Sequence, residues 1–229
     1  MLLGLDTATE ILRIALLEGE RTWTRTVPAE RGRSHSLVLM PALDTLVREA
    51  GFRPAELAGI VCCVGPGGFT GLRTGVATAE GLALTGVPTW GFSSFALWAE
   101  ALCQAGQGGP FWILLDGQRG EAFLQRWEGG TPQPARREAI ASLEGVLGQE
   151  GWFAPCNFAE RLVGLPGRLH LDAEDAAAEA ALASLVRRRS KEPPETPLVP
   201  FYLRETDAEA KFPEASAHLP ESHRLGQPR

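Results

Sequence analysis

The chain has 229 residues, a formal net charge of −6 and a hydrophobic fraction of 44%. These values exclude a disordered chain, which would combine few apolar residues with a high net charge. The acidity also argues against a protein that binds nucleic acid on its own, because affinity for phosphates needs a basic surface. Contact with nucleic acid inside a complex stays open.

The sequence carries no pattern for a membrane span, a secretion signal or a metal site. No uncharged apolar run reaches the roughly 18 residues of a transmembrane helix. The N-terminus has no basic region and contains the charged residue Asp6 near its start, so it is not typical of a secretion signal. The 4 cysteines form no Cys-x-x-Cys pair and the 4 histidines no His-x-x-x-His pattern. We therefore expect a reduced, cytoplasmic protein without a metal or a membrane partner.

The first half of the sequence predicts an α/β layer, in which strands alternate with helices. Short apolar runs between turn residues indicate the strands, and apolar residues at helical spacing after a capping residue such as Ser34 indicate the helices. Pro41 predicts a kink or a late start in its helix. In chain order we predict strands at 2–5, 11–17 and 21–27, a helix at 35–50, a strand at 59–64, a helix at 72–85, a strand at 87–90 and a helix at 94–105.

The second half contains a weak repeat of the first. A strand at 111–115 ends at Asp116 and the next begins at Glu121, just as the strand that ends at Asp6 is followed by one from Ile11. Two similar lobes would then face each other across a cleft, each with an aspartate at the end of its first strand. Two unrelated hairpins explain the spacing equally well.

Composition divides the chain into three regions, with the main boundary in a glycine-rich stretch before residue 111. A helix is predicted over 172–189, and a stiff, proline-rich linker follows it. The predicted regions are an N-terminal lobe with partner-binding helices over 1–104, a C-terminal lobe over 105–204 and a flexible tail over 205–229.

Two features form a candidate vestigial nucleotide or anion site, and each has a structural alternative. The loop at 65–71 opens a helix, where backbone N–H groups can hold an anion, but it lacks the Walker lysine, and we favour a tight turn that lets helix and strand approach closely. Asp6 could flank a phosphate or hydrated Mg²⁺, but no glycine follows it, so we favour an aspartate that caps its own turn. The residues of this candidate site are Asp6, Gly65, Gly67, Gly68 and Asp116.

The helices predicted at 35–50 and 72–85 are more apolar than a surface helix needs to be. The first has two neighbouring apolar stripes, and the second has small residues four positions apart that permit a close helix contact. One stripe would pack on the sheet and the other would bind a partner; the alternative is a helix enclosed in its own domain. We favour the interface and assign to it Val38, Leu39, Ala42, Leu46, Gly75, Ala79 and Leu82.

Two further features have mainly structural interpretations. The basic run Arg187-Arg188-Arg189 could touch RNA, but such a run more often complements a helix dipole. His35 could act as a general base, but no nucleophile is placed beside it, so we expect a cap or surface residue.

Several motifs together resemble the bacterial TsaB (YeaZ) family. The resemblance covers most of residues 2–127 and then thins to a short stretch before residue 205. The motifs are Leu5-Asp6-Thr7-Ala8-Thr9-Glu10, Arg33-Ser34-His35-Ser36, the highly specific Gly65-Pro66-Gly67-Gly68-Phe69-Thr70-Gly71-Leu72-Arg73, Gly91-Phe92-Ser93-Ser94, Asp116-Gly117-Gln118-Arg119-Gly120-Glu121 and Pro200-Phe201-Tyr202-Leu203-Arg204.

The resemblance implies an α/β fold of the actin-like ATPase type (ASKHA, ribonuclease H-like), with two lobes, mixed sheets and flanking helices. It implies a non-catalytic partner of TsaD, the transferase that makes threonylcarbamoyladenosine next to the tRNA anticodon. TsaE would bind with TsaD and this chain in a ternary complex, and the chain would also form a homodimer. The chain would contact tRNA only indirectly.

The resemblance also separates this chain from the catalytic relative. TsaD holds its metal partly through a His-x-x-x-His, whereas the comparable residues 91–97 contain no histidine. No cofactor is therefore expected, and the sequence does not support ATP and Mg²⁺ at a subunit interface. The family usually has Ser at Gly68 and Lys at Glu80, so Glu80 reverses a charge on the predicted interface helix.

The alternative function is an independent nucleotide hydrolase or small-molecule kinase of the same fold. It would use Asp6 and Asp116 across the cleft, and the lack of glycine next to Asp6 counts against it.

Overall fold

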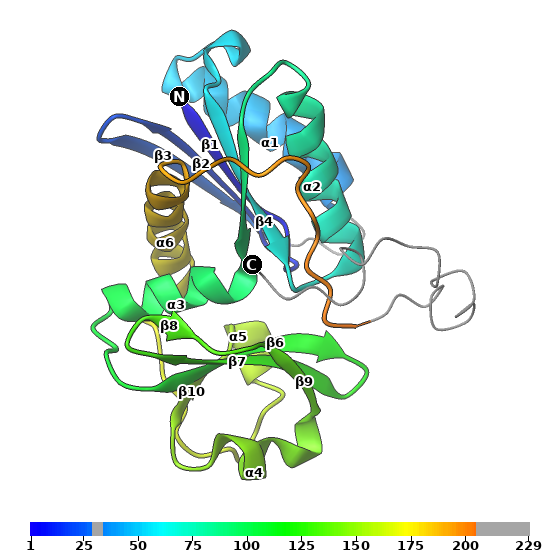
Figure 1. The fold of residues 1–229 in the computed structure, drawn as a ribbon, viewed down its shortest axis with the longest axis vertical. Coiled ribbons are helices and arrows are strands. Elements are labelled where there is room, and N and C mark those ends of the chain that lie inside the picture. Colours follow the sequence, from blue (N-terminus) through cyan, green and yellow to red (C-terminus); the bar gives the residue numbers. More distant parts are fainter. Residues whose placement is uncertain (29–33, 205–229) are drawn as a thin grey trace, which may run out of the picture.

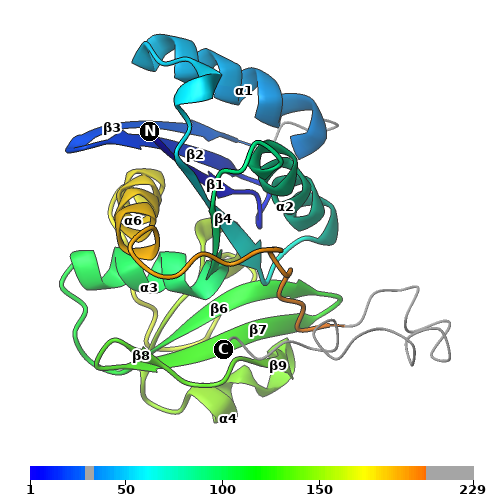
Figure 2. The same cartoon turned by 45° about the horizontal axis from the view of Figure 1, so that its top comes forward.

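The computed structural model describes residues 1–28 and 34–204. Two five-stranded sheets are stacked with helices outside and between them (Figures 1 and 2). The elements are β1 (Leu2–Asp6), β2 (Leu12–Glu18), β3 (Arg21–Val27), α1 (His35–Ala50), η1 (Pro54–Glu56), β4 (Gly59–Gly65), α2 (Phe69–Ala83), β5 (Thr89–Ser93), α3 (Ser94–Gln104), β6 (Phe111–Gln118), β7 (Glu121–Glu128), β8 (Thr131–Pro132), β9 (Arg136–Ala139), η2 (Ile140–Ser142), α4 (Leu143–Leu147), β10 (Gly151–Phe153), α5 (Cys156–Ala159) and α6 (Glu174–Arg189).

The first sheet has the strand order β3-β2-β1-β4-β5. Short turns make β1, β2 and β3 antiparallel, whereas β4 and β5 are parallel to β1 because α1 and α2 cross over between them. Leu3 and Leu5 pack toward α1 and α2, while Ala15 and Leu17 belong to the core on the other face. This mixed sheet with flanking helices is the predicted actin-like arrangement.

The second sheet has the order β10-β6-β7-β8, with β9 also paired to β7. Strands β6 and β7 form a hairpin whose two central residues, Arg119 and Gly120, have φ of 55° and 82°. Positive φ at both positions matches the twist of a two-residue hairpin. One face of this sheet packs toward α3, and the other covers α4 and α5 through residues such as Leu114 and Leu124.

We call the first sheet with α1, α2 and α6 the first lobe, and the second sheet with α4 and α5 the second lobe. Helix α3 lies between the two sheets (Figure 2). Helix α6 follows the second sheet in the chain but packs against β1, β2 and β3 of the first. The predicted division of the chain at residue 105 stays a prediction, and the predicted tail at 205–229 lies outside the described residues.

The observed ends of the first two helices lie at or within three residues of the predicted ones. Helix α1 spans the predicted residues and is capped at its C-terminus by Gly51, which has φ of 78°. Pro41 lies inside α1, which already begins at His35, so the late start that Pro41 could indicate is not observed. Helix α2 begins at Phe69, three residues before the prediction, because Gly68 already serves as its N-cap. In the described residues, the helices are too short or too polar to cross a membrane.

Candidate functional site

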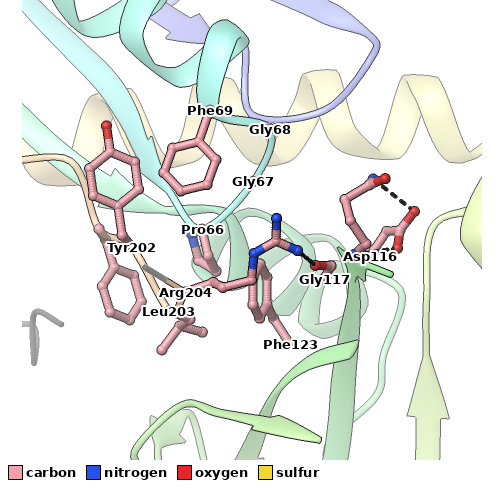
Figure 3. A pocket seen from close by; sticks show the side chains of 12 residues that line it. Pro66, Gly67, Gly68, Phe69, Asp116, Gly117, Phe123, Tyr202, Leu203 and Arg204 are labelled. Atoms are coloured by element: carbon pink, nitrogen blue, oxygen red, sulfur yellow. Dashed lines mark hydrogen bonds between the residues drawn. The ribbon is translucent and has the colours of Figure 1, made fainter. Parts of the chain in front are cut away.

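A cleft of about 690 Å³ lies between the lobes. Its walls come from the turn after β1, the start of α1, the loop before α2, the end of β6 and α5. A smaller cavity of about 60 Å³ shares that loop and Asp116 with it, and residues 201–204 line one side (Figure 3). Of the predicted site residues, Gly67, Gly68 and Asp116 line the cleft, whereas Asp6 and Gly65 do not.

The glycine-rich loop is pressed against the turn after β1. A Cβ atom at Gly67 would lie 2.1 Å from the carbonyl oxygen of Ala8, and one at Gly75 would lie 2.2 Å from Thr7 Oγ1. The N–H of Gly68 donates to the Ala8 carbonyl at 2.8 Å. An amide that would face an anion is thus used within the chain, which favours the tight-turn interpretation of the loop.

Asp6 is buried where β1 ends. Its Oδ1 accepts a hydrogen bond from the N–H of Ala8 at 3.0 Å, and its Oδ2 lies 3.6 Å from Arg13 Nη1. Arg13 faces Asp6 across the β1–β2 pair and donates from Nη2 to Asp175 Oδ1 at 2.9 Å. The Asp6 carboxylate therefore caps its own turn and is neutralised by a cation from the same chain.

Asp116 repeats this arrangement in the second lobe. Its Oδ1 accepts from the N–H of Gln118 at 2.8 Å, and its Oδ2 accepts from Gln118 Nε2 and from the Arg161 guanidinium. Unlike Asp6, the Asp116 side chain is partly exposed to the cleft. Each strand-end aspartate thus has an arginine partner.

These residues do not fit a metal-bound nucleotide, the ligand that an ATPase-type cleft would take. Such a ligand needs carboxylates and loop amides that are free to bind it. Asp6 and Asp116 are each paired with a guanidinium, and the Gly68 amide has an internal acceptor. In the described part of the chain, His, Cys, Asp and Glu side chains form no group of three that could hold a metal ion. In both lobes the aspartate caps its own turn, and only the Asp6 pair is buried.

The structure changes the prediction for the helix interface. Leu39, Leu46 and Ala79 are at most 2% exposed and lie in the core between α1, α2 and the first sheet, and Gly75 is buried against Thr7. These residues face the chain's own interior because the sheet and the neighbouring helix cover them. The remaining predicted interface residues, Val38, Ala42 and Leu82, are half-buried around this core.

Other apolar side chains of the same helix layer are exposed. Leu37 is 64% and Met40 is 49% exposed on α1, and Leu84 is 89% exposed just after α2. Sequence reasoning did not assign these residues to the interface. The spacing of the apolar residues did not tell which of them the sheet would cover, and the use of this helix layer as an interface stays a prediction.

Residues 191–204, which we call the strap, run from α6 to the small cavity. Glu80 Oε1 accepts the N–H of Leu198 at 2.7 Å, so the charge that departs from the family pattern anchors the strap to α2. Tyr202 stacks on Phe69 with ring centroids 4.8 Å apart, and Arg204 Nη1 donates to the Gly117 carbonyl at 3.1 Å (Figure 3). The predicted linker therefore connects α2 with the second lobe.

The basic run at the end of α6 is used within the chain. Arg187 donates to the β2–β3 turn, Arg188 pairs with Glu100 and Arg189 pairs with Glu195 of the strap. His35 Nε2 lies 2.7 Å from the Thr9 carbonyl oxygen and holds the start of α1 to the turn after β1. Both features are structural contacts within the chain, but the arginines bind other elements and His35 holds the turn after β1, whereas Ser34 is the N-cap.

The thiols show no sign of activation. Burial raises the pKa of Cys62 and of Cys63. Cys156 is exposed, and its contact with the Glu174 carboxylate raises its pKa as well. A reactive thiol needs a lowered pKa, so these cysteines are poor candidates for a nucleophile.

Comparisons with known proteins agree with the motifs. The family model described as "TsaD: tRNA N6-adenosine threonylcarbamoyltransferase" matches residues 19–172, more than half of the chain. The tRNA threonylcarbamoyladenosine biosynthesis protein TsaB of Bacillus subtilis is 28% identical over 233 residues, which cover 93% of this chain and 98% of that protein. The chain belongs to this family, and within it to the TsaB (YeaZ) group.

Two further matches within the TsaB group differ in extent. The TsaB protein of Haemophilus influenzae is 29% identical over 127 residues, 55% of this chain but only 52% of that protein. The chain thus matches about half of that relative's length. The structure of YeaZ from Pseudomonas aeruginosa has a TM-score of 0.65 at 23% identity and covers 83% of this chain and 93% of that one. This likeness shows the fold that the TsaB group shares.

Proposed function

We propose that this chain is a non-catalytic subunit needed for threonylcarbamoyl transfer to the adenosine next to the tRNA anticodon, and that it acts by binding and stabilising TsaD. Membership of the TsaB group supports the pathway. The observation that carries the non-catalytic role is the pairing of Asp6 with Arg13 and of Asp116 with Arg161. Asp6 is buried beside its cation, and Asp116 is paired at the edge of the cleft, so each carboxylate already has a partner within the chain.

The docking surface that we propose is the outer face of α1 and α2. Exposed Leu37 and Met40 supply apolar area there, and half-buried Val38, Ala42 and Leu82 border it. TsaD is the proposed partner, and a second copy of the chain would use the same face in a homodimer. TsaE would join TsaD and this chain in a ternary complex.

Contact with tRNA would be indirect, because the chain is acidic and its arginine run is occupied internally. Because the proposed complex modifies tRNA, we propose that it acts in the cytoplasm. Of the originally assigned interface residues, Leu39, Leu46, Gly75 and Ala79 would support the face from below rather than touch the partner.

Reconstitution tests the proposed role. Purified TsaD, TsaE, unmodified tRNA and threonylcarbamoyl-AMP are combined with and without this chain, and modified adenosine is measured by mass spectrometry. We expect modification only when the chain is present, and none when it replaces TsaD. Equal modification without the chain would contradict the proposal.

A charge on the docking surface tests where the partner binds. Leu37→Asp should lose co-purification with TsaD, since a charge in a desolvated contact weakens binding by roughly 2 kcal/mol or more. Val163→Asp is the matched control, because Val163 is 90% exposed in the second lobe. If Leu37→Asp and the control bind equally, another face binds TsaD, whatever the reconstitution shows.

The alternative, an independent nucleotide hydrolase or kinase, makes the opposite prediction for ligand binding. Calorimetric titration of the purified chain with Mg²⁺ and ATP should give no binding heat. Tight binding that Asp6→Ala or Asp116→Ala removes would favour the alternative.

A further inference from the structure

Arg13 is an enclosed cation at the junction of several elements. Its side chain is 1% exposed and lies between Asp6 at the end of β1 and Asp175 in the first turn of α6. The Arg13 Cζ atom also lies 5.3 Å from the ring centroid of Trp98 on α3. A guanidinium over a tryptophan face is attracted by the ring, and more strongly when both are removed from water.

The contacts continue from Trp98 into the second lobe. The ring centroids of Trp98 and Phe153 are 5.2 Å apart, and Phe153 belongs to β10 of the second sheet. Helix α3, which carries Trp98, lies between the two sheets (Figure 2). Three side chains, Arg13, Trp98 and Phe153, therefore connect the first sheet to the second through buried contacts.

The hydrogen bonding of Arg13 indicates that its charge matters more than its volume. Its Nε and Nη1 atoms are buried without a hydrogen-bond partner among the described residues. An apolar side chain of similar size would fill the space without this penalty. What an apolar side chain would not supply is a cation for Asp6, which is itself buried and has Arg13 as its ion-pair partner.

We propose that Arg13 is an internal clamp that holds the two lobes in one relative arrangement without a bound ligand. It fixes the turn after β1 to α6 through its two carboxylate partners, and it fixes both to α3 through Trp98. The lobes of this chain would then not open and close around a ligand. This inference does not depend on the proposed partner, because the clamp is contained in the isolated chain.

The distance between the lobes tests the clamp in the full chain. Spin labels are placed on Cys156 of the second lobe and on an Ala77→Cys site of α2, with Cys103→Ser to remove the other exposed thiol. Cys62 and Cys63 are buried and stay unlabelled. The labelled chain should show one narrow distance distribution by pulsed electron resonance. In Arg13→Met the distribution should broaden about twofold or gain a second component, as expected for lobes released from a fixed contact.

Two further variants keep this test decisive. Arg126→Met is the matched control, since Arg126, like Arg13, pairs with two carboxylates of its own lobe, Glu128 and Glu150. Arg13 differs by lying over Trp98 of α3, so the distribution of Arg126→Met should stay narrow. If Arg13→Met does not fold, Asp175→Asn removes the negative charge that Arg13 faces at a half-exposed position but keeps an acceptor oxygen, and should broaden the distribution less. An unchanged narrow distribution in whichever of the two clamp variants folds overturns the clamp. Equal broadening in Arg126→Met overturns it as well.

Discussion

Asp6 and Asp116 occupy corresponding positions in the two lobes and differ mainly in what surrounds them. Asp6 is the last residue of β1, and Asp116 lies two residues before the end of β6. Each accepts the N–H of the residue two positions on and pairs with an arginine. The side chain of Asp6 is 2% exposed, whereas that of Asp116 is 25% exposed. The turn at each aspartate thus depends only on residues next to it in the sequence. Its burial depends on elements that lie further along the chain.

The difference separates two roles for the same motif. In the first lobe the glycine-rich loop packs on the turn after Asp6, and side chains of α3 and α6 contact Arg13. Asp6 and Arg13 are both buried, so their ion pair is held in a low-dielectric interior. In the second lobe the aspartate stays at the cleft, where water screens its pair with Arg161. The first pair therefore holds structure together, and the second contributes little to stability.

Removing each aspartate in turn should give the largest difference in the free energy of unfolding between a variant of the first lobe and one of the second. Asp6→Ala leaves Arg13 buried with one partner fewer and should lower the free energy of unfolding by about 3–5 kcal/mol. Asp116→Ala should lower it by only about 1 kcal/mol, since the pair is partly exposed. Urea denaturation followed by tryptophan fluorescence measures both values. Equal losses would remove the distinction between the two lobes.

The packing of α2 on the first aspartate turn should give a smaller effect. Gly75→Ala would place a methyl group 2.2 Å from Thr7 Oγ1, and we expect a loss of about 1–3 kcal/mol in the free energy of unfolding. Gly81→Ala is the control on the same helix, because a Cβ there meets no atom within 4 Å. It should gain about 0.5–1 kcal/mol from helix propensity. A stabilising Gly75→Ala would mean that the turn is not tightly packed against α2.

The junction of α3 with α6 gives the smallest predicted effect, through its pH dependence. Burial raises the pKa of Glu100, but hydrogen bonds from Ser184, Gln104 and Arg188 outweigh it and lower the pKa below 4.5. A carboxyl with a lowered pKa in the folded state stabilises the protein above the pKa of the unfolded chain and loses that contribution as the pH falls through the folded value. Glu100→Gln should therefore lose about 1 kcal/mol near pH 7 and show a shallower decline on acidification.

Thermal unfolding at pH 7 and pH 3 checks this prediction. The melting temperatures of the variant and the parent should differ at pH 7 and converge at pH 3. A constant difference at both values would assign the effect of Glu100 to packing rather than to charge.

The fold could be predicted from the sequence because its signals are local. The apolar runs around Asp6 and Asp116, the cap at Gly51 and the turn residues of the glycine-rich loop fix where elements begin and end. The loop's role as a tight turn was one of the two interpretations that its sequence allowed. Its contact with Ala8 decides between them.

The site could be predicted only in part, because its partners are distant in the chain. Asp175 lies on an element that returns from beyond the second sheet, and nothing in the sequence near Arg13 indicates that contact. Periodicity identified α1 and α2 as unusually apolar, but it could not show that the sheet and the neighbouring helix cover Leu39 and Ala79 and leave Leu37 exposed. The spacing of apolar residues shows on which side of a helix they lie, but it does not show how many of them the neighbouring elements bury.

The strap has a consequence for how the first sheet meets other chains. Strand β5 is the last in its sheet, so its outer amides and carbonyls would be open to pairing with a foreign strand. Glu195 prevents this, because its N–H donates to the Thr89 carbonyl at 2.7 Å and its carboxylate accepts the N–H of Gly91 at 3.1 Å. A shortened chain that ends before the strap would expose β5 as an unpaired edge strand, and we expect it to aggregate by strand pairing between molecules.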